Sequence, residues 1–445
     1  MQSEEKRIEE QILLLEIKTK EIVNEGIKNQ IIDPTIRSYY TWKVDRKLFE
    51  KSNGQHIQKT PQIISKTDWN TTAIDIFRDI QETETYQTTL NEIKNKYPKQ
   101  TNIENMTSGF VRKTIKDTLN NAEKTNNKSI LLKDLNNEPV RWTVSAEFQG
   151  IAIEDEKIVL NDGSTLRKPR IEDLEKVTGL WDIPHQQNML SDPSAILEFE
   201  TYATNPYTVQ EKVEKCTATF KLFKVGNAQW TSYRMIPDSF KAIGGTLSIK
   251  NFQMAPNKYT ILKSERGFFE DFYKEYFDKV PTAFSRPKDS RDYLPIAFER
   301  YAEALIDNPF ERRIMYAMMS FEAIFSESDQ EISFKLRTRI SKMFGLLGYK
   351  PLEITKEIRK AYGIRSTFAH GGILSSKDRQ KINTDEILNN ILDYVRISIL
   401  IMISSGYEKS KFIQLIDDAI VDPSSDGELK KVLENSLKTQ IKNAR

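Results

Sequence analysis

The chain has 445 residues, more than one hydrophobic core usually supports, so we expect two to four domains. Its 66 Lys and Arg residues nearly balance 64 Asp and Glu residues. This balance excludes a uniformly basic coat and an acidic disordered tail, so any nucleic-acid site must be a local basic patch. The single cysteine, Cys216, and three histidines exclude a disulfide scaffold and a Cys/His zinc cluster. We therefore expect no metal and no cofactor.

Hydropathy gives an expectation for location. The first ten residues are charged throughout, and the longest apolar run, Ile397–Ile403, is far too short to cross a bilayer. We therefore expect a cytoplasmic protein with no membrane partner.

The first region, residues 1–135, is predicted to be mainly helical. Apolar residues and one threonine recur at spacings of four and three, which places them on one stripe of a helix that ends near Gly26. They are Ile8, Ile12, Leu15, Thr19 and Ile22. The stripe favours internal packing, with a partner or dimer helix as the alternative.

The second region, residues 136–265, changes to a period of two, which is typical of half-buried strands. The alternation is clear around Trp142–Phe148 and again at Ala218, Phe220 and Leu222. Five further segments have the composition of strands and are separated by turn residues: 157–160, 196–202, 230–236, 246–252 and 259–263. About seven strands in this span predict a β-sandwich-like or barrel-like domain for recognition or regulation.

The third region, residues 266–445, returns to a helical period. Its first helix carries crowded aromatic residues, and we expect these to pack the β-rich region onto the later helices: Phe268, Phe269, Phe272, Tyr273, Tyr276 and Phe277. The remaining helices predict an all-α bundle. The whole chain is thus predicted to be a multidomain α+β protein.

One string in the bundle suggests a site for phosphodiester chemistry. Arg365 and His370 are separated by four residues in the sequence YGIRSTFAHGG. A permanently cationic Arg can stabilise a phosphorane, and a His that titrates near neutral pH can move a proton. That chemistry requires no metal.

Positive charge is concentrated just before this string. Between positions 335 and 365 nine Lys or Arg residues face only two Glu residues, a pattern that indicates a site for a polyanion. The predicted RNA-binding residues are Arg337, Arg339, Lys342, Arg359 and Lys360. The alternative is a solvated basic helix pair in which the Arg and the His are ordinary polar residues.

The same stretch resembles a known family. The helix 312–325 with the sequence MSFEAIF, the basic helix after it, and the Tyr-x-x-Arg-Ser-x-x-x-His-Gly string together resemble an Apea-like HEPN domain over residues 285–410. The strands at 148–167 also resemble, less specifically, the region that precedes this domain in multidomain bacterial members.

The resemblance implies a metal-independent endoribonuclease, often an effector of bacterial toxin or antiphage systems, whose active site forms across a HEPN dimer. It implies that Arg365 and His370 are the catalytic pair, that Ser366 is the polar residue that usually comes after the Arg, and that Glu322 orients the pair. RNA, a second copy of the chain and a regulatory protein or phage-derived trigger are the implied partners. One family subgroup, controlled by a nucleotidyltransferase, has a Tyr where this chain has Gly372, which argues against that control.

Helix geometry and proton counting also favour a dimer. RNA cleavage needs one group to accept a proton and another to donate one, whereas the chain offers a single well-placed His. Residues five apart on a helix project about 140° from each other. A helix end or a cleft between two chains must therefore bring Arg365 and His370 together.

Two other functions remain open. The bundle could be a catalytically silent module that dimerises or binds nucleic acid in a larger complex, because a fold does not imply an activity. Asp155-Glu156-Lys157 also has the acidic-x-Lys form of Mg-dependent nucleases, although its position between two strands predicts a polar hairpin tip.

Overall fold

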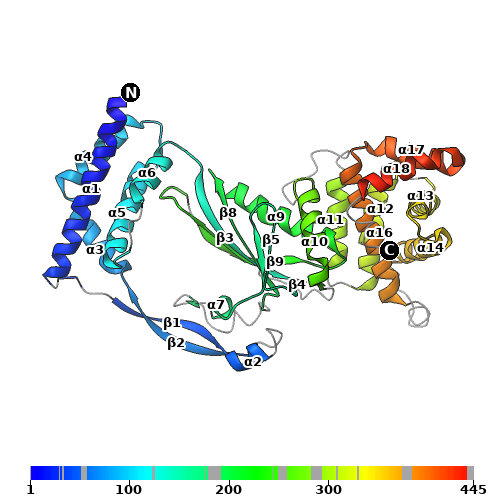
Figure 1. The fold of residues 1–445 in the computed structure, drawn as a ribbon, viewed down its shortest axis with the longest axis horizontal. Coiled ribbons are helices and arrows are strands. Elements are labelled where there is room, and N and C mark those ends of the chain that lie inside the picture. Colours follow the sequence, from blue (N-terminus) through cyan, green and yellow to red (C-terminus); the bar gives the residue numbers. More distant parts are fainter. Residues whose placement is uncertain are drawn as a thin grey trace.

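A computed structural model describes most of the chain, namely residues 2–29, 31–32, 35–51, 58–122, 126–175, 177–178, 192–242, 244–248, 258–281, 293–306, 309–327, 330–372 and 383–437. The fold is mixed α+β. Helices from the N-terminal third lie at one end of the molecule, a β-sheet lies in the middle, and a helical bundle lies at the other end (Figure 1).

The N-terminal helices pack around one buried cluster. They are α1 (Gln2–Lys28), α3 (Asn70–Gln81), α4 (Glu84–Lys96), α5 (Ile103–Leu119) and α6 (Asn127–Leu135). The predicted stripe on α1 is confirmed, because Ile8, Ile12, Leu15 and Thr19 are buried while Ile22 is half-buried. The stripe packs internally, as expected for an amphipathic helix on a helical core.

The prediction of a mainly helical first region missed a long β-hairpin. Strands β1 (Thr35–Val44) and β2 (Lys59–Asp68) pair antiparallel over ten residues each, with the short helix α2 (Arg46–Lys51) after β1. The short strand β7 (Val177–Thr178) joins the edge of β1. The hairpin extends between the N-terminal helices and the centre of the molecule (Figure 1). It contains a Pro and many polar residues, which hid its strand period.

The central sheet is a single antiparallel layer in the order β10-β9-β3-β8-β6-β5. Its strands are β3 (Val140–Gln149), β5 (Lys157–Val159), β6 (Thr165–Arg167), β8 (Ala195–Ala203), β9 (Gln229–Pro237) and β10 (Gly245–Ser248). Five of these agree with predicted strands, β6 was not predicted, and residues 249–252 of the segment 246–252 lie outside the described residues. Alternate residues of β3, from Val140 to Phe148, are buried. A separate parallel pair joins β4 (Ile151–Ile153) to β11 (Tyr259–Ile261), the latter within the predicted segment 259–263.

The β-sandwich prediction is wrong, because a helix takes the place of the second sheet. The segment with Ala218, Phe220 and Leu222 is the C-terminal half of α9 (Pro206–Phe223) and not a strand. Every residue from Cys216 to Phe223 is buried, so burial leaves no polar stripe from which a helical period could be read. The rings of Phe148 on the sheet and Phe220 on α9 lie 5.4 Å apart.

Helix α10 (Arg266–Tyr276) joins the central layer to the bundle, as its aromatic residues predicted. Its Phe269, Phe272, Tyr273 and Tyr276 are buried. The Tyr276 hydroxyl donates a hydrogen bond to the carbonyl of Ser436 at the far end of the chain. The bundle consists of α11 (Tyr293–Leu305), α12 (Phe310–Phe325), α13 (Ile332–Leu346), α14 (Pro351–Ala369), α16 (Thr384–Ser405), α17 (Lys409–Val421) and α18 (Asp426–Ser436).

The buried residues form two clusters. One lies within residues 8–135, and the other runs from Val140 to Leu437 and so joins the sheet, α9 and the bundle in one core. Helix α16 is the one described helix long and apolar enough to cross a membrane, but 72% of its most apolar stretch is buried inside the protein. Its composition is therefore that of a core helix.

Candidate functional site

The candidate site is built on α14. The helix begins with Pro351 at its first position, where a missing N–H costs nothing. Ile354, Ile358, Ala361 and Ile364 form its buried stripe.

The helix stops at His370 through a Schellman motif, in which the N–H of Gly371 bonds to the Phe368 carbonyl and the N–H of Gly372 to the Thr367 carbonyl. Gly371 has a φ of 81°, a left-handed conformation that favours glycine. A Cβ on Gly372 would lie 2.8 Å from Thr367 Cγ2. The two glycines after His370 therefore have a structural role.

The structure brings Arg365 and Glu322 together, whereas Glu322 has no contact with His370 among the described hydrogen bonds and ion pairs. Arg365 lies on the inward side of α14, and its Nη2 donates a hydrogen bond of 3.1 Å to Oε2 of Glu322 on α12. The side chains are 27% and 18% exposed, respectively. The second carboxylate oxygen, Glu322 Oε1, is buried and has no hydrogen-bond partner in the part of the chain that is described. The pair therefore sits just below the surface with one unused acceptor.

Burial raises the pKa of the Glu322 carboxyl above its ordinary value, although the Arg365 cation opposes this shift. A raised pKa means that folding favours the protonated form, so the associated stability is present at acidic pH and is lost as pH rises through the folded pKa. Glu322→Gln stays neutral throughout.

We therefore expect the stability of Glu322→Gln, relative to the natural protein, to increase as pH rises from acid to neutral. Urea unfolding at a series of pH values measures this difference. A difference that does not change with pH, or that favours the natural protein more as pH rises, would contradict this assignment.

His370 lies on a different side of α14. It is exposed at the C-cap position. Exposed residues continue the same face towards the start of the helix at helical spacing, and they are Lys356, Arg359, Lys360, Gly363 and Thr367. We call this set with His370 the basic stripe. No hydrogen bond to the His370 side chain is present among the described residues. Because the helix continues through Ala369, the helix end does not bring the His370 side chain towards Arg365. Within one chain the two residues therefore lie on separate faces of α14.

The other polar candidate, Ser366, is half-buried, and its carbonyl accepts the backbone N–H of His370 at 3.2 Å. The structure gives its hydroxyl no partner among the described residues, so only the main chain of Ser366 takes part in the helix end.

The predicted RNA-binding set needs a correction at α13. Arg339 is buried, donates to both carboxylate oxygens of Asp417 on α17, and donates to the Phe325 carbonyl on α12. Lys342 forms an ion pair with Asp426 on α18, with Nζ 2.5 Å from Oδ1. Arg339 thus joins three helices and cannot also contact phosphate, while Lys342 is engaged at the base of α18. A count of charges along the sequence cannot distinguish a buried Arg from an exposed one.

Two aromatic residues near the site were not predicted. The Arg365 guanidinium lies 5.7 Å from the ring centre of Tyr362, and that of Arg337 lies 5.7 Å from the ring of Phe334. Phe334 is 56% exposed. A Tyr three residues before an Arg on a helix is the signal that could have indicated the first contact.

Antiparallel packing brings these aromatics to one level. The hydroxyls of Ser341 on α13 and Thr355 on α14 are 2.7 Å apart. Phe334 lies seven residues before Ser341 on α13, and Tyr362 lies seven residues after Thr355 on α14. Both aromatics therefore lie at the His370 end of the helix pair.

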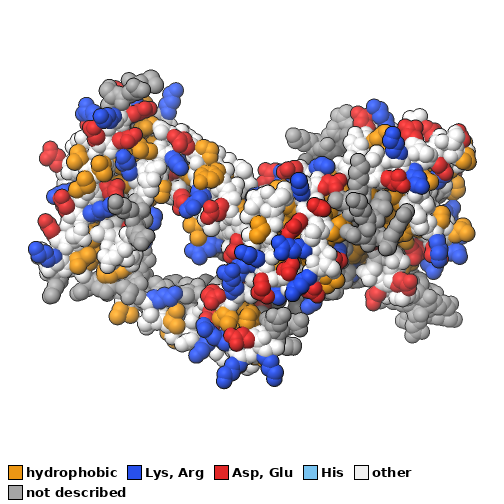
Figure 2. Space-filling model, in the orientation of Figure 1, with side chains coloured by type: hydrophobic (Ala, Val, Ile, Leu, Met, Phe, Trp, Pro, Cys, Tyr) orange, Lys and Arg blue, Asp and Glu red, His pale blue; other side chains and the backbone are white. Residues whose placement is uncertain are grey.

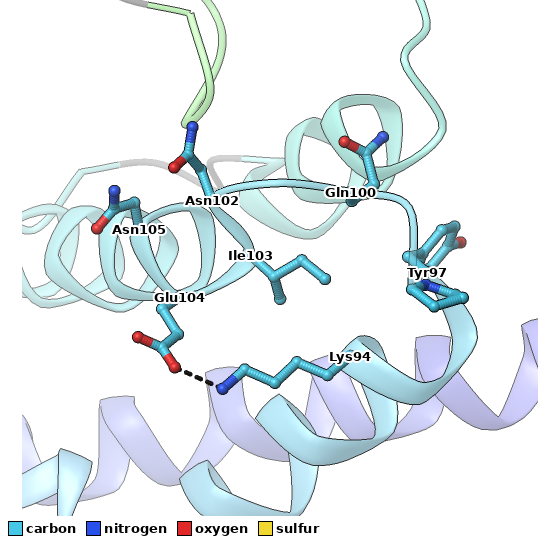
Figure 3. A pocket seen from close by; sticks show the side chains of 8 residues that line it. Lys94, Tyr97, Gln100, Asn102, Ile103, Glu104 and Asn105 are labelled. Carbon is cyan, nitrogen blue, oxygen red and sulfur yellow. Dashed lines mark hydrogen bonds and ion pairs between the residues drawn. The ribbon is translucent and has the colours of Figure 1, made fainter.

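Two pockets lie away from these residues. One, of about 390 Å³, is a polar depression beside the junction of α4 and α5, where Lys94 and Glu104 form an ion pair and Tyr97 lines one end (Figure 3). Another lies between α5 and the segment after β9, next to Phe240. Neither contains Arg365 or His370.

The acidic-x-Lys string is a turn with no metal-binding cluster among the described residues. Asp155 and Glu156 lie in the turn between β4 and β5, and Glu156 pairs with Lys168 at 3.0 Å. The described residues contain no group of three His, Cys, Asp or Glu side chains that could hold a metal ion. This turn is therefore the polar hairpin tip that its position predicted.

Comparison with known proteins gives no relative: no family model matches the chain, and neither the curated proteins nor the solved structures give a match.

Proposed function

We propose that this protein is a metal-independent endoribonuclease whose active site forms between the C-terminal bundles of two copies. The observation that carries the proposal is that Arg365, paired with Glu322 of α12, and an exposed His370 lie on one helix, α14, beside exposed basic residues. The likeness of residues 285–410 to an Apea-like HEPN domain supports it.

The chemistry would proceed by transfer within the RNA. The ribose 2′-hydroxyl loses a proton to one imidazole and attacks the adjacent phosphorus, and the bond to the 5′-oxygen breaks as a second imidazole protonates it. The products are a 2′,3′-cyclic phosphate and a 5′-hydroxyl. Arg365 would stabilise the negative charge of the phosphorane. Glu322 would hold Arg365 in position.

Two features of a single chain support assembly of the site from two copies. Arg365 and His370 lie on different faces of α14, and each chain offers one His at the site. Glu322 Oε1 is a buried acceptor without a partner among the described residues, and a donor from bound RNA or from the second copy would satisfy it. A homodimer with a two-fold axis near the two His370 side chains would supply the two imidazoles that the reaction needs.

The direct test is incubation of the purified protein with RNA in EDTA, beside a His370→Ala protein. We expect cleavage by the natural protein alone. RNA that stays intact in the presence of the natural protein, with or without Mg²⁺, would leave the silent dimerisation or nucleic-acid-binding module as the better function.

The basic stripe predicts how RNA binding depends on salt. Replacing Lys356, Arg359 and Lys360 by Ala should weaken binding and reduce the slope of log affinity against log salt by about 2, because each phosphate contact contributes about 0.7 for a single strand. Three exposed lysines on other helices, Lys274, Lys430 and Lys431, make a control of equal charge. An equal effect from both triple variants would mean that the stripe is an ordinary solvated face.

The shared site predicts a dominant effect of inactive chains. With a threefold excess of His370→Ala chains and full exchange, dimers of two natural chains fall to about one sixteenth of the total, whereas dilution alone leaves about one quarter. Activity should track the lower value if both histidines are needed. Activity proportional to the natural chain in fully exchanged mixtures would contradict the shared site.

The biological role we propose is that of a cytoplasmic effector in a bacterial toxin or antiphage system. The central sheet and the N-terminal helices would then receive a regulatory protein or a phage-derived trigger. The central sheet, α9 and the bundle share one continuous core, which would connect such a signal to α14.

A further inference from the structure

The N-terminal helix α1 has a second apolar face that the core does not use. Leu13, Leu14 and Ile17 are 44%, 51% and 46% exposed. In an ideal helix they lie on the side opposite the buried residues Ile12 and Thr19. Large aliphatic side chains grouped in this way on a surface mark an interaction site more often than isolated ones do.

The surroundings of this face allow access to it. α1 lies in the group of helices at the end of the molecule farthest from the bundle (Figure 1). Figure 2 shows apolar side chains among charged ones on the surface of this N-terminal part. The neighbouring helices of α1 contact its other side, where Ile8 and Leu15 are buried.

The charges that flank the apolar face indicate which partner fits it. Glu10 precedes the three residues on the same side of the helix, and Lys20 comes after them, and both are exposed. In a parallel pair of α1 helices in register, Glu10 would face Glu10 of the other copy and Lys20 would face Lys20, so both contacts would join like charges. In an antiparallel pair with Leu13 level with Ile17 of the other copy, Glu10 is level with Lys20 of that copy.

We propose that α1 is a self-association surface that binds α1 of a second copy of this chain in antiparallel orientation. The contact would bury Leu13, Leu14 and Ile17 of both copies at a two-fold axis close to Leu14, with a Glu10–Lys20 pair on either side. In this register Glu10 and Lys20 are complementary in sign, whereas a different protein would need its own matching face. This surface is separate from α14 and does not depend on the proposed nuclease function.

Cross-linking can test this contact because the natural cysteine, Cys216, is buried. A Leu14→Cys protein treated with a short bis-maleimide should give a covalent dimer. The matched control is Ile74→Cys on α3, which is also apolar and 46% exposed but lies outside the face. A yield no higher than that of Ile74→Cys would overturn the proposal.

Charge exchange decides whether the orientation is correct. Added to Leu14→Cys, either Glu10→Lys or Lys20→Glu should reduce the cross-linked dimer about fivefold, since each creates two like-charge pairs. Mixing the two charge variants should restore the yield, because the mixed pair again has opposite charges at both positions. Equal yields in the separate and the mixed samples would overturn the antiparallel self-pair. That result is also the one expected if α1 binds another protein instead of a second copy. Circular dichroism melting of each variant confirms that α1 is folded, because Lys20 also pairs with Glu16 within the chain.

Discussion

Replacing His370 by Ala is expected to lower the rate of RNA cleavage about 10²–10⁴-fold, the usual contribution of a general acid or base. The imidazole is exposed, so the fold should be unaffected. RNA binding should stay within a small factor, because phosphate contacts along the basic stripe remain. Single-turnover cleavage and a binding titration, measured on the same samples, separate the two effects.

Arg365→Ala should lower the rate by about 10²–10³-fold, because it removes the charge that stabilises the transition state. It also leaves the Glu322 carboxyl without its cation, so the double change Arg365→Ala with Glu322→Gln separates a folding defect from a catalytic one. Lys356→Ala on the same helix is the control and should affect binding alone. A natural rate in both the His370 and Arg365 variants would show that the pair is not catalytic.

Replacing Arg396 by Ala is expected to cost about 2–4 kcal/mol of stability. This buried residue of α16 forms an ion pair with Asp393 and donates to the carbonyls of Leu222 and Phe223 at 3.0 Å each. Those carbonyls end α9, which has no glycine cap. Removing the guanidinium therefore leaves buried acceptors unsatisfied and a helix dipole without its cation.

Urea unfolding of the Arg396 variant measures this cost. Arg300→Ala breaks an ion pair of the same i,i+3 type on α11, in which Arg300 is 30% exposed, and should change stability by less than about 0.5 kcal/mol. Equal losses from Arg396 and Arg300 would mean that the α9 contacts contribute little and that the sheet and the bundle are held by apolar packing alone.

The elements that were predictable from sequence are those with one buried face. The stripe on α1 and the alternation in β3 each have an exposed side that reveals the period. Helix α9 has no such side in its last eight residues, so its Ala218-x-Phe220-x-Leu222 pattern resembled a strand. A better signal was present in Asn205-Pro206: the Asn205 side chain accepts the Thr208 N–H, and Pro206 takes the first helical position.

In the candidate site, too, features that depend on local sequence were predictable, and features that depend on contacts between distant residues were not. The spacing of Arg365 and His370 on one helix is fixed by the sequence, and so is their divergence in direction. The engagement of Arg339 by Asp417, 78 residues later, depends on tertiary packing that no local pattern contains. The density of charged residues in the sequence predicted part of the basic surface on α13. In the structure the basic surface is instead the exposed stripe of α14.

The chemistry of the RNA ends tests the proposed mechanism most directly. RNA of defined sequence, incubated with the natural protein in excess EDTA, should yield fragments with a 2′,3′-cyclic phosphate and a 5′-hydroxyl, and His370→Ala should yield none above background. Mass spectrometry of the fragments identifies both ends. Fragments that carry a 5′-phosphate, or cleavage that requires added Mg²⁺, would contradict transfer by the Arg365 and His370 pair.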